Sequence, residues 1–356
     1  MIQSEVSTQF IDLDEVILVT GATGFIGPAL VRNLLDRGFC KIRCFARQSS
    51  NLTRLKGDEF IRKGATIEIV KGNLLSRNDC AKAVKDAAVV FHLAAGRGQK
   101  SFPDAYINSV VATRNLLDAI VIEKCLRRFV NVSSFSVYTN RRKRAGRLLD
   151  ESCEVEIQPT DRGDAYCFAK TKQDEIVAEY GKTQGLKYVI VRPGYVYGPD
   201  MNSISGRVGI GSFGVFLHLG GSNTIPFTFV DNCADALACA GLTGGVDGEI
   251  FNIVDDDLPS SRRFLRLYKR NVQSFTSLYL PHALSYLLCY IWERYSIWSQ
   301  GQLPPVYNRR AWHAYWKKTR YSNDKLKRQL GWKPHVSTSE GLQLYFEACK
   351  RRLTNA

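Results

Sequence analysis

The sequence predicts an α/β fold: a doubly wound parallel sheet with helices on both faces, followed by a smaller, mainly helical C-terminal substrate lobe. Apolar runs of strand length alternate with amphipathic stretches of helix length through the first two hundred of the 356 residues. A glycine-rich turn, TGATGFIG, directly follows the first apolar run. After Tyr197 the alternation loosens into glycine-rich sequence. We therefore place the sheet domain at 14–197 and most of the lobe at 198–356.

Each expected element follows from its local pattern. Strands are expected at 16–20, 42–46, 66–70, 89–93, 129–132 and 188–191, with helices between them at 26–36, 79–85, 104–123 and 164–183. Strands separated by helices of this length form βαβ units, whose strands are parallel. A late strand at 250–254 should return to the same sheet. Helices are also expected at 232–242, 262–269 and 283–298, which we assign to the lobe, and at 324–330 and 340–351, which close the chain.

The cysteines and histidines limit the cellular compartment and the kinds of site that we expect for this protein. The ten cysteines include no CxxC pair, and the first apolar run leads straight into the glycine turn as a buried strand, not a secretory leader. We therefore expect a reducing, cytoplasmic location. The five histidines show no metal-ligand spacing, so we predict no metal.

The positive charge is concentrated toward the C-terminus. The formal net charge is +15, and residues 262–333 hold fifteen Lys/Arg against two acids, which leaves the rest of the chain nearly balanced. The RRKR run at 141–144 is expected to be a solvated loop, because the region shows no recognised nucleic-acid module. We predict a small-molecule substrate and no nucleic-acid partner.

The turn TGATGFIG predicts a Rossmann-type dinucleotide site. Gly21, Gly24 and Gly27 give a GxxGxxG spacing, with Phe25 and Ile26 inside the same turn. The first glycine allows a tight turn, the second lets the backbone approach a pyrophosphate, and the third packs helix against strand. The helix that follows offers free N–H groups and partial positive charge to the phosphates.

Residues after the next strands should complete this site. Arg47 stands where an acidic residue would indicate NAD, and no acid occurs from 37 to 57, so the sequence favours NADP while NAD stays possible. A solvated surface arginine is the alternative interpretation of Arg47. Two pairs of residues after the third and fourth strands are expected to flank the dinucleotide: Asn73 with Leu74, and Ala94 with Ala95.

Tyr166 and Lys170 supply the expected chemistry. They are four residues apart on an expected helix and so share one face. A lysine ammonium there should lower the tyrosine pKa, because an opposite charge favours the phenolate. Such a tyrosine can give a proton to a carbonyl oxygen or take one from an alcohol. Beside a nicotinamide, this is the chemistry of hydride transfer.

With these motifs the chain resembles the extended short-chain dehydrogenase/reductases, in the NAD-dependent epimerase/dehydratase group. The resemblance runs from about Val16 to the final helix. It rests on TGATGFIG, GNLL at Gly72, FHLAA at Phe91, NSVVATRNLL at Asn108, VSSFSVY at Val132, YCFAK at Tyr166, RPGYVYGP at Arg192, FTFVDNCADAL at Phe227 and SNDKLKRQLGWKP at Ser322.

The resemblance implies a catalytic trio of Ser134, Tyr166 and Lys170, in which Ser134 bonds the substrate oxygen and Lys170 also binds the nicotinamide ribose. Ser134 follows a strand at the carboxyl edge of the expected sheet, where such folds bind ligands. The resemblance further implies that Asn108 lies near the cofactor phosphates, that Pro193 and Val196 pack beside the nicotinamide, and that a homodimer is an option.

Three departures from the family pattern stand out. Thr139 follows Tyr138 where glycine is usual, and Asn73 replaces the commoner Asp. We expect both changes to leave hydride transfer intact. The insertion TNRRKRAGRLLD near the active-site entrance leaves substrate identity open.

Two substrate classes and one other class of protein remain. A nucleotide sugar is favoured, with Arg207 as a candidate phosphate ligand or else a solvated loop residue. The alternative is a ketone reductase or 3-beta-hydroxysteroid-dehydrogenase-like enzyme acting on a lipophilic compound, which Arg47 and the QSSN that follows it resemble. A non-enzymatic dinucleotide sensor is disfavoured, because it has no need for the full trio.

The apolar segment 277–299 admits two interpretations. Its apolar run of about fifteen residues is short for a membrane span, which takes about 20. We expect a core helix of the substrate lobe. The alternative is that Trp292, Tyr295, Trp298 and the surrounding Lys/Arg dock the lobe peripherally on an anionic membrane.

Overall fold

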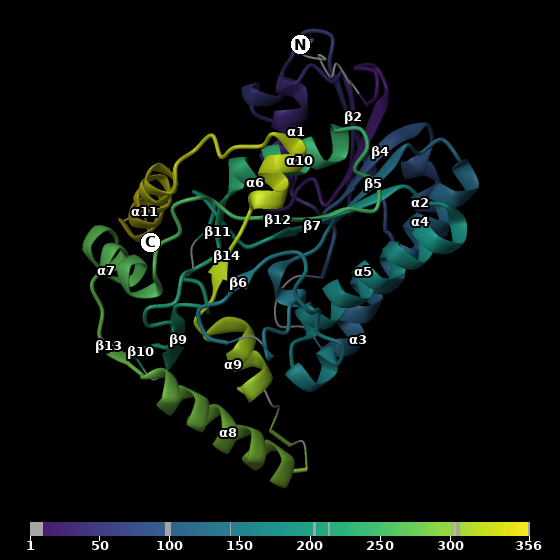
Figure 1. Cartoon of the computed structure of the whole chain (residues 1–356). Helices are drawn as coiled ribbons and strands as arrows, with labels where there is room; N and C mark the ends of the chain where they lie inside the picture. Colours follow the sequence, from purple (N-terminus) through teal and green to yellow (C-terminus); the bar gives the residue numbers. More distant parts are fainter. Residues whose placement is uncertain are drawn as a thin grey trace, which may run out of the picture.

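The computed structural model describes residues 10–96, 101–142, 144–201, 204–212, 214–300, 302–303 and 307–354. Its centre is a seven-stranded parallel sheet in the order β12-β7-β5-β4-β1-β2-β3 (Figure 1). The strands are β1 Val16–Thr20, β2 Lys41–Ala46, β3 Thr66–Lys71, β4 Ala87–His92, β5 Arg128–Val132, β7 Tyr188–Pro193 and β12 Ile250–Ile253. The predicted α/β fold class is confirmed.

Helices cover both faces of this sheet. They are α1 Gly27–Asp36, α2 Arg77–Val84, α4 Ala112–Glu123, α5 Ala165–Gln184 and α6 Val230–Leu242. Helices α1 and α6 pack together on one face, and α2, α4 and α5 on the other. Because side chains alternate along a strand, Ile17 and Val19 of β1 enter one core, while Leu18 between them enters the other.

Helix α6 lies on the sheet and not in the lobe where we expected it. It packs against α1, β5 and β7. Its sequence, VDNCADALACAGL, is rich in Ala and Cys, and ten of its thirteen residues are buried. Small side chains on every face let the helix fit closely between α1 and the sheet, so the expected assignment to the lobe is wrong.

The single helix expected at 104–123 is divided. A short α3, Phe102–Ala105, continues into a π-helical turn, η3, Tyr106–Val111, and then into α4. A π turn accommodates an extra residue and changes which side chains face a neighbour, and such turns are frequent at functional sites. Asn108 lies in this turn.

The remaining elements form small sheets and helices outside the main sheet. Their strands are β6 Leu148–Leu149, β8 Tyr195–Tyr197, β9 Gly209–Ser212, β10 Val215–His218, β11 Phe227–Phe229, β13 Ser277–Tyr279 and β14 Arg320–Tyr321. They pair as β13-β10-β9, β11-β8 and β14-β6. The helices are α7 Ser261–Asn271, α8 His282–Trp298, α9 Arg309–Tyr315, α10 Asp324–Leu330 and α11 Thr338–Thr354. We did not predict α9 or the small strands.

Helix α8 contradicts the expectation of a core helix. It lies at one end of the molecule, beyond α9 and far from the main sheet (Figure 1). Only Ser285, Cys289 and Ser296 of its residues are buried. Within the described residues, no helix combines the length and the hydropathy that crossing a bilayer requires.

Candidate active site

The glycine turn has the geometry that a bound dinucleotide needs. Gly21 has φ +72°, and a Cβ at this position would lie 2.9 Å from the Ala94 nitrogen, so only glycine fits. The Gly24 N–H donates to the Gly21 carbonyl at 2.9 Å, which closes the turn. A Cβ on Gly27 would lie 2.3 Å from the Ala22 carbonyl oxygen. Helix α1 begins without a side-chain cap after Ile26, so its first N–H groups stay available to an anion.

A pocket of about 330 Å³ opens beside this turn at the carboxyl ends of β1 to β4. Eight predicted residues line it: Gly21, Gly24, Arg47, Asn73, Leu74, Ala94, Ala95 and Asn108. Eight others were not predicted: Thr23, Phe45, Ala46, Ser50, Leu75, Leu93, Gly96 and Ala112. Most of these adjoin predicted residues at strand ends, so extending each predicted pair by one or two positions would have found them.

The remaining predicted cofactor residues do not line this pocket. They are Phe25, Ile26, Gly27, Tyr166, Lys170, Pro193 and Val196. Pro193 ends β7, beside β12, and Val196 lies in β8, paired with Thr228 of β11. Pro193 is at the carboxyl end of β7 and Val196 just beyond it, at the same edge of the sheet where Ser134 follows β5. Their predicted place beside a nicotinamide stays a prediction.

Arg47 lies exposed at the end of β2, and Ser50 lines the same part of the pocket. Ser50 donates its N–H to the Arg47 carbonyl at 2.9 Å, which holds the two residues in one turn. No acidic side chain is among the described residues that line this pocket. A guanidinium and a hydroxyl at this position suit a phosphate better than a ribose diol.

The structure brings Ser134, Tyr166 and Lys170 together where the end of β5 meets the start of α5. The Ser134 hydroxyl accepts a hydrogen bond from the Ser136 N–H at 3.1 Å, and its interaction with the Tyr166 hydroxyl lowers the pKa of Tyr166. Lys170 is buried, and its Nζ donates to the Val132 carbonyl at 2.7 Å. The trio is therefore assembled from two elements far apart in the chain.

The electrostatics of Tyr166 differ from the expectation. Loss of solvent around its hydroxyl raises the pKa, although the hydrogen bond with Ser134 lowers it. The Lys170 ammonium, which we expected to lower this pKa, is turned toward Val132. The net direction for the protein alone is upward, because desolvation of the phenolate outweighs the hydrogen bond.

Lys170 sits above a buried carboxylate. Asp174, one turn further along α5, accepts hydrogen bonds from Asn131 at 2.8 Å and Ser133 at 2.9 Å and pairs with Arg192 at 3.0 Å. Burial lowers the pKa of Lys170 to about 8, while the charge of Asp174 raises it. With a pKa of about 8, Lys170 is mostly cationic at pH 7 and loses its proton just above it.

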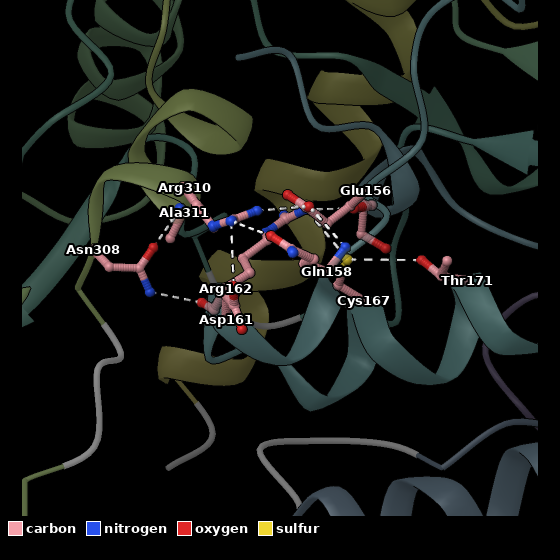
Figure 2. Close-up of polar contacts among 10 residues, drawn as sticks. Glu156, Gln158, Asp161, Arg162, Cys167, Thr171, Asn308, Arg310 and Ala311 are labelled. Carbon is pink, nitrogen blue, oxygen red and sulfur yellow. Dashed lines mark hydrogen bonds and ion pairs between the residues drawn. The ribbon is translucent and has the colours of Figure 1, made fainter. Parts of the chain in front are cut away.

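The first turn of α5, which carries Tyr166, is held by contacts from α9 and from the 3-10 turn η5, Pro159–Arg162 (Figure 2). Asp164 caps α5 by accepting from the Cys167 N–H at 3.0 Å, and the Tyr315 hydroxyl donates to the same carboxylate. Arg162 is fully buried, lies 4.6 Å from the centre of the Tyr315 ring and donates to the Ser136 carbonyl at 2.5 Å. This arginine therefore links the loop after Ser134 to the start of α5.

A second arginine extends this network. Arg310 of α9 pairs with Glu156 at 2.9 Å and Asp161 at 3.2 Å and donates to Gln158 at 2.6 Å (Figure 2). Glu156 is 2% exposed, so its carboxylate depends on this partner. The C-terminal region thus contributes directly to the position of the predicted acid/base.

Arg207 is engaged with the protein itself. It donates to the Ala314 carbonyl at 3.1 Å and to the Tyr321 hydroxyl at 3.4 Å. Its guanidinium lies 5.1 Å from the centre of the Tyr315 ring that Arg162 also contacts. The sequence pattern could not predict these contacts, because they join segments more than a hundred residues apart.

His92 is a structural residue. It bonds Thr20 at 2.8 Å and Thr113 at 2.9 Å in the core, and burial lowers its pKa to about 3, so it stays neutral. Across the described part of the chain, no group of three His, Cys, Asp or Glu side chains could hold a metal ion.

Comparison with known proteins finds relatives over most of the chain. The family model described as "NAD dependent epimerase/dehydratase family" matches residues 17–253. The 3beta-hydroxysteroid-dehydrogenase/decarboxylase isoform 2 of Arabidopsis thaliana is 28% identical over 239 residues, which cover 63% of this chain and 40% of that protein. UDP-N-acetyl-alpha-D-glucosaminuronate decarboxylase of Bacillus cytotoxicus is 27% identical over 252 residues, covering 67% and 75%. The chain spans about half the length of the first curated relatives it matches.

Solved structures share the fold across nearly the whole chain. UDP-glucuronic acid 4-epimerase from Bacillus cereus, in complex with UDP-glucuronic acid and NAD, superposes with a TM-score of 0.70 at 23% identity, covering 95% of this chain and 99% of that one. The likeness at this identity concerns the fold.

Proposed function

The chain belongs to the NAD dependent epimerase/dehydratase family, and from this premise we propose that it moves a hydride between a dinucleotide and a carbon bearing a hydroxyl or keto group. The observation that carries the proposal is the convergence of Ser134, Tyr166 and Lys170 on one side of the sheet edge that holds the glycine-turn pocket. A sensor that only bound a dinucleotide would gain nothing from this convergence.

Each residue has a proposed role. Gly21 and the uncapped start of α1 would hold the pyrophosphate, and the nicotinamide, when bound, supplies the hydride chemistry. The Tyr166 hydroxyl gives a proton to the substrate oxygen during reduction and takes one during oxidation. The Ser134 hydroxyl, already bonded to Tyr166, donates to the same oxygen. In the protein alone the Lys170 ammonium is turned toward Val132; facing the phenol, its charge would favour loss of the phenol proton.

NADP is the cofactor we propose, with NAD as the alternative. Arg47 and Ser50 line the pocket where the adenosine ribose would lie, and a 2′-phosphate could accept hydrogen bonds from both. The related epimerase structure binds NAD, so the family alone does not decide the choice.

Substitution of Tyr166 tests the mechanism. We expect Tyr166→Phe to lower kcat/KM by about 10²- to 10⁴-fold, because proton transfer is lost, while dinucleotide affinity stays within about twofold. Turnover is followed by NADPH absorbance and affinity by fluorescence titration. Tyr290→Phe, an exposed tyrosine on α8, is the matched control. Equal activity in Tyr166→Phe and the control would refute the mechanism.

A nucleotide sugar is the first substrate class we propose. The segment IPFTFVDNCADAL resembles sugar-nucleotide enzymes. The Bacillus cytotoxicus relative is named for a UDP-sugar substrate, and the related structure contains UDP-glucuronic acid. An enzyme of this kind that acts as an epimerase would keep its cofactor bound from one turnover to the next.

A lipophilic ketone or hydroxysteroid is the second substrate class, and two contacts favour it. Arg207, the candidate phosphate ligand, already uses its Nη1 in hydrogen bonds to Ala314 and Tyr321. Arg47 lines the pocket in the position typical of NADP, which suits a reductase that exchanges its cofactor. The Arabidopsis relative is named for a steroid reaction.

One experiment separates the two classes. Native mass spectrometry of the purified protein shows which dinucleotide and ligand co-purify, and a panel of UDP-sugars and hydroxysteroids is then assayed with NADPH and NADP. Retained NAD and conversion of a UDP-sugar would support the first class. Exchangeable NADP and turnover of a steroid or similar ketone would support the second, and turnover of neither would favour the sensor.

A further inference from the structure

Helix α8 presents its apolar side chains to the outside and its small polar ones to the protein. The residues that share the outer stripe are Leu284, Leu287, Leu288, Ile291, Tyr295 and Trp298, all at least 42% exposed. Their spacing of three and four residues places them on one face of the helix. The buried positions carry Ser285, Cys289 and Ser296. A helix that contributed to a core would have the opposite arrangement.

The orientation of α8 is held by specific contacts. The Ser285 hydroxyl accepts from the Trp312 indole N–H at 2.9 Å, and the Ser296 hydroxyl donates to the Leu303 carbonyl at 2.5 Å. Glu293 receives two hydrogen bonds from the Arg309 guanidinium, both at 3.0 Å. Because these contacts join α8 to α9 and to the chain that follows α8, the helix cannot turn its apolar stripe inward without losing them.

The apolar surface extends beyond the stripe and is bordered by cations. Leu278 and Tyr279 of β13 are also exposed. Arg262 lies 5.2 Å from the centre of the Tyr279 ring, and Arg309 lies 4.8 Å from that of Tyr290. Since Glu293, the only acid on α8, is paired with Arg309, the charge left on the helix is that of exposed Arg294.

We propose that α8 docks on an anionic lipid surface, with its outer stripe among the upper acyl chains and the exposed Arg262 and Arg294 on the headgroups. Aromatic side chains at the C-terminal end of the helix, where Tyr295 and Trp298 stack 5.6 Å apart, suit the level between acyl chains and headgroups. An amphipathic helix with an apolar face and flanking cations binds such surfaces without crossing them.

Charge and shape select a membrane over a second copy of the chain. Residues 262–333 carry fifteen cations and two acids, so two copies meeting at α8 would bring like charges together. The same excess attracts anionic headgroups. Helix α8 also lies at one end of the molecule (Figure 1).

Vesicle co-sedimentation of the full chain tests the proposal. Vesicles of phosphatidylcholine alone are compared with vesicles containing phosphatidylserine, at low and high salt. We expect binding to the anionic vesicles, weakened by salt, with a blue shift of tryptophan fluorescence as Trp298 enters the interface. Equal binding to both kinds of vesicle, or to neither, would overturn the proposal.

Two matched variants locate the surface. Leu287→Glu/Ile291→Glu places charges on the stripe at exposed positions, so folding is not expected to suffer, and vesicle binding should fall at least about tenfold. The control is Ile61→Glu/Ile157→Glu, which changes two isoleucines exposed elsewhere, and it should bind as the wild type does. Unchanged binding in the α8 variant, or its conversion from dimer to monomer on gel filtration, would contradict membrane docking. None of these measurements requires turnover, so they stand apart from the catalytic proposal.

Discussion

Lys170 is the proposed catalytic residue whose titration can be followed most directly. Its pKa is lowered to about 8 by burial, and the charge of Asp174 opposes this shift. Reduction of a ketone needs Tyr166 protonated and Lys170 cationic. Since the pKa of Tyr166 is raised, it stays protonated through this range, and the loss of charge on Lys170 should limit the rate.

We therefore expect kcat/KM for reduction to fall as pH rises through about 8. Asp174→Asn removes the carboxylate that raises the Lys170 pKa and pairs with Arg192, and it keeps an oxygen for Asn131 and Ser133, so the fall should move to lower pH. The pH profile is measured between 5 and about 10, with thermal unfolding to check the fold. A midpoint shared by both proteins would exclude this coupling.

Arg47 makes a separate prediction about the cofactor. Arg47→Asp should lower the preference for NADP over NAD, expressed as the ratio of kcat/KM values, by about ten- to a hundredfold, because a charge-assisted bond to phosphate becomes a repulsion. Lys56→Asp carries the same charge change in an exposed position outside the pocket lining and serves as the control. If both variants change the ratio equally, Arg47 does not contact the phosphate.

Single residues show what the sequence could reveal. The positions of Gly21 and Arg47 in the pocket were predictable from the sequence, because Gly21 belongs to a glycine-rich turn and Arg47 follows the end of a strand. The direction of the Lys170 ammonium toward Val132, and the engagement of Arg207 by Ala314 and Tyr321, were not predictable. Both depend on side-chain contacts between segments that only the folded chain brings together.

At the scale of elements, the start of α5 depends on a helix from the other end of the chain. Arg310 of α9 supplies the charge partner of Glu156, which is 2% exposed. Arg310→Ala leaves this carboxylate buried without its partner, and we expect a loss of about 2 to 4 kcal/mol in the free energy of unfolding. Arg142→Ala removes the exposed pair with Glu154 and should cost at most about 1 kcal/mol.

Urea denaturation measures both variants. A smaller loss of unfolding free energy in Arg310→Ala than in Arg142→Ala would mean that the Glu156 carboxylate finds other partners and that α9 does not stabilise the start of α5. If α9 does stabilise it, the activity of Arg310→Ala should also fall, since the first turn of α5 carries Tyr166.

Two helices explain the limits of pattern analysis. Helix α6 is built mainly of small residues, so its sequence did not indicate which layer it belongs to; its place beside α1 depends on strand order. Helix α8 has clear apolar periodicity, but periodicity gives a face and not the direction in which that face points. The main strands were predictable because each is a short segment rich in apolar residues between turns, with boundaries within two residues of those observed.

At the scale of the whole molecule, Asp255 joins three parts of the chain. It follows β12, accepts from the Phe229 N–H at 2.8 Å and the Asn232 amide at 2.9 Å at the start of α6, and Asn232 in turn bonds the His335 and Val336 N–H groups before α11. Burial raises the pKa of Asp255 to about 7.

This shift predicts a pH dependence of stability. The folded protein holds the Asp255 proton more tightly than the unfolded chain, in which an Asp carboxyl has a pKa near 3.9. The contribution of this proton to the free energy of unfolding is therefore full below about pH 4 and is lost as pH rises through about 7. Asp255→Asn cannot titrate, so the difference in unfolding free energy between it and the wild type should change across this window and be constant outside it. A constant difference from pH 4 to about 8 would contradict the shift.

The basic residues are concentrated in one stretch of the chain: residues 262–333 carry fifteen Lys/Arg against two acids, while the rest of the chain is nearly balanced. We expect this stretch to hold the protein on a cation-exchange resin at neutral pH.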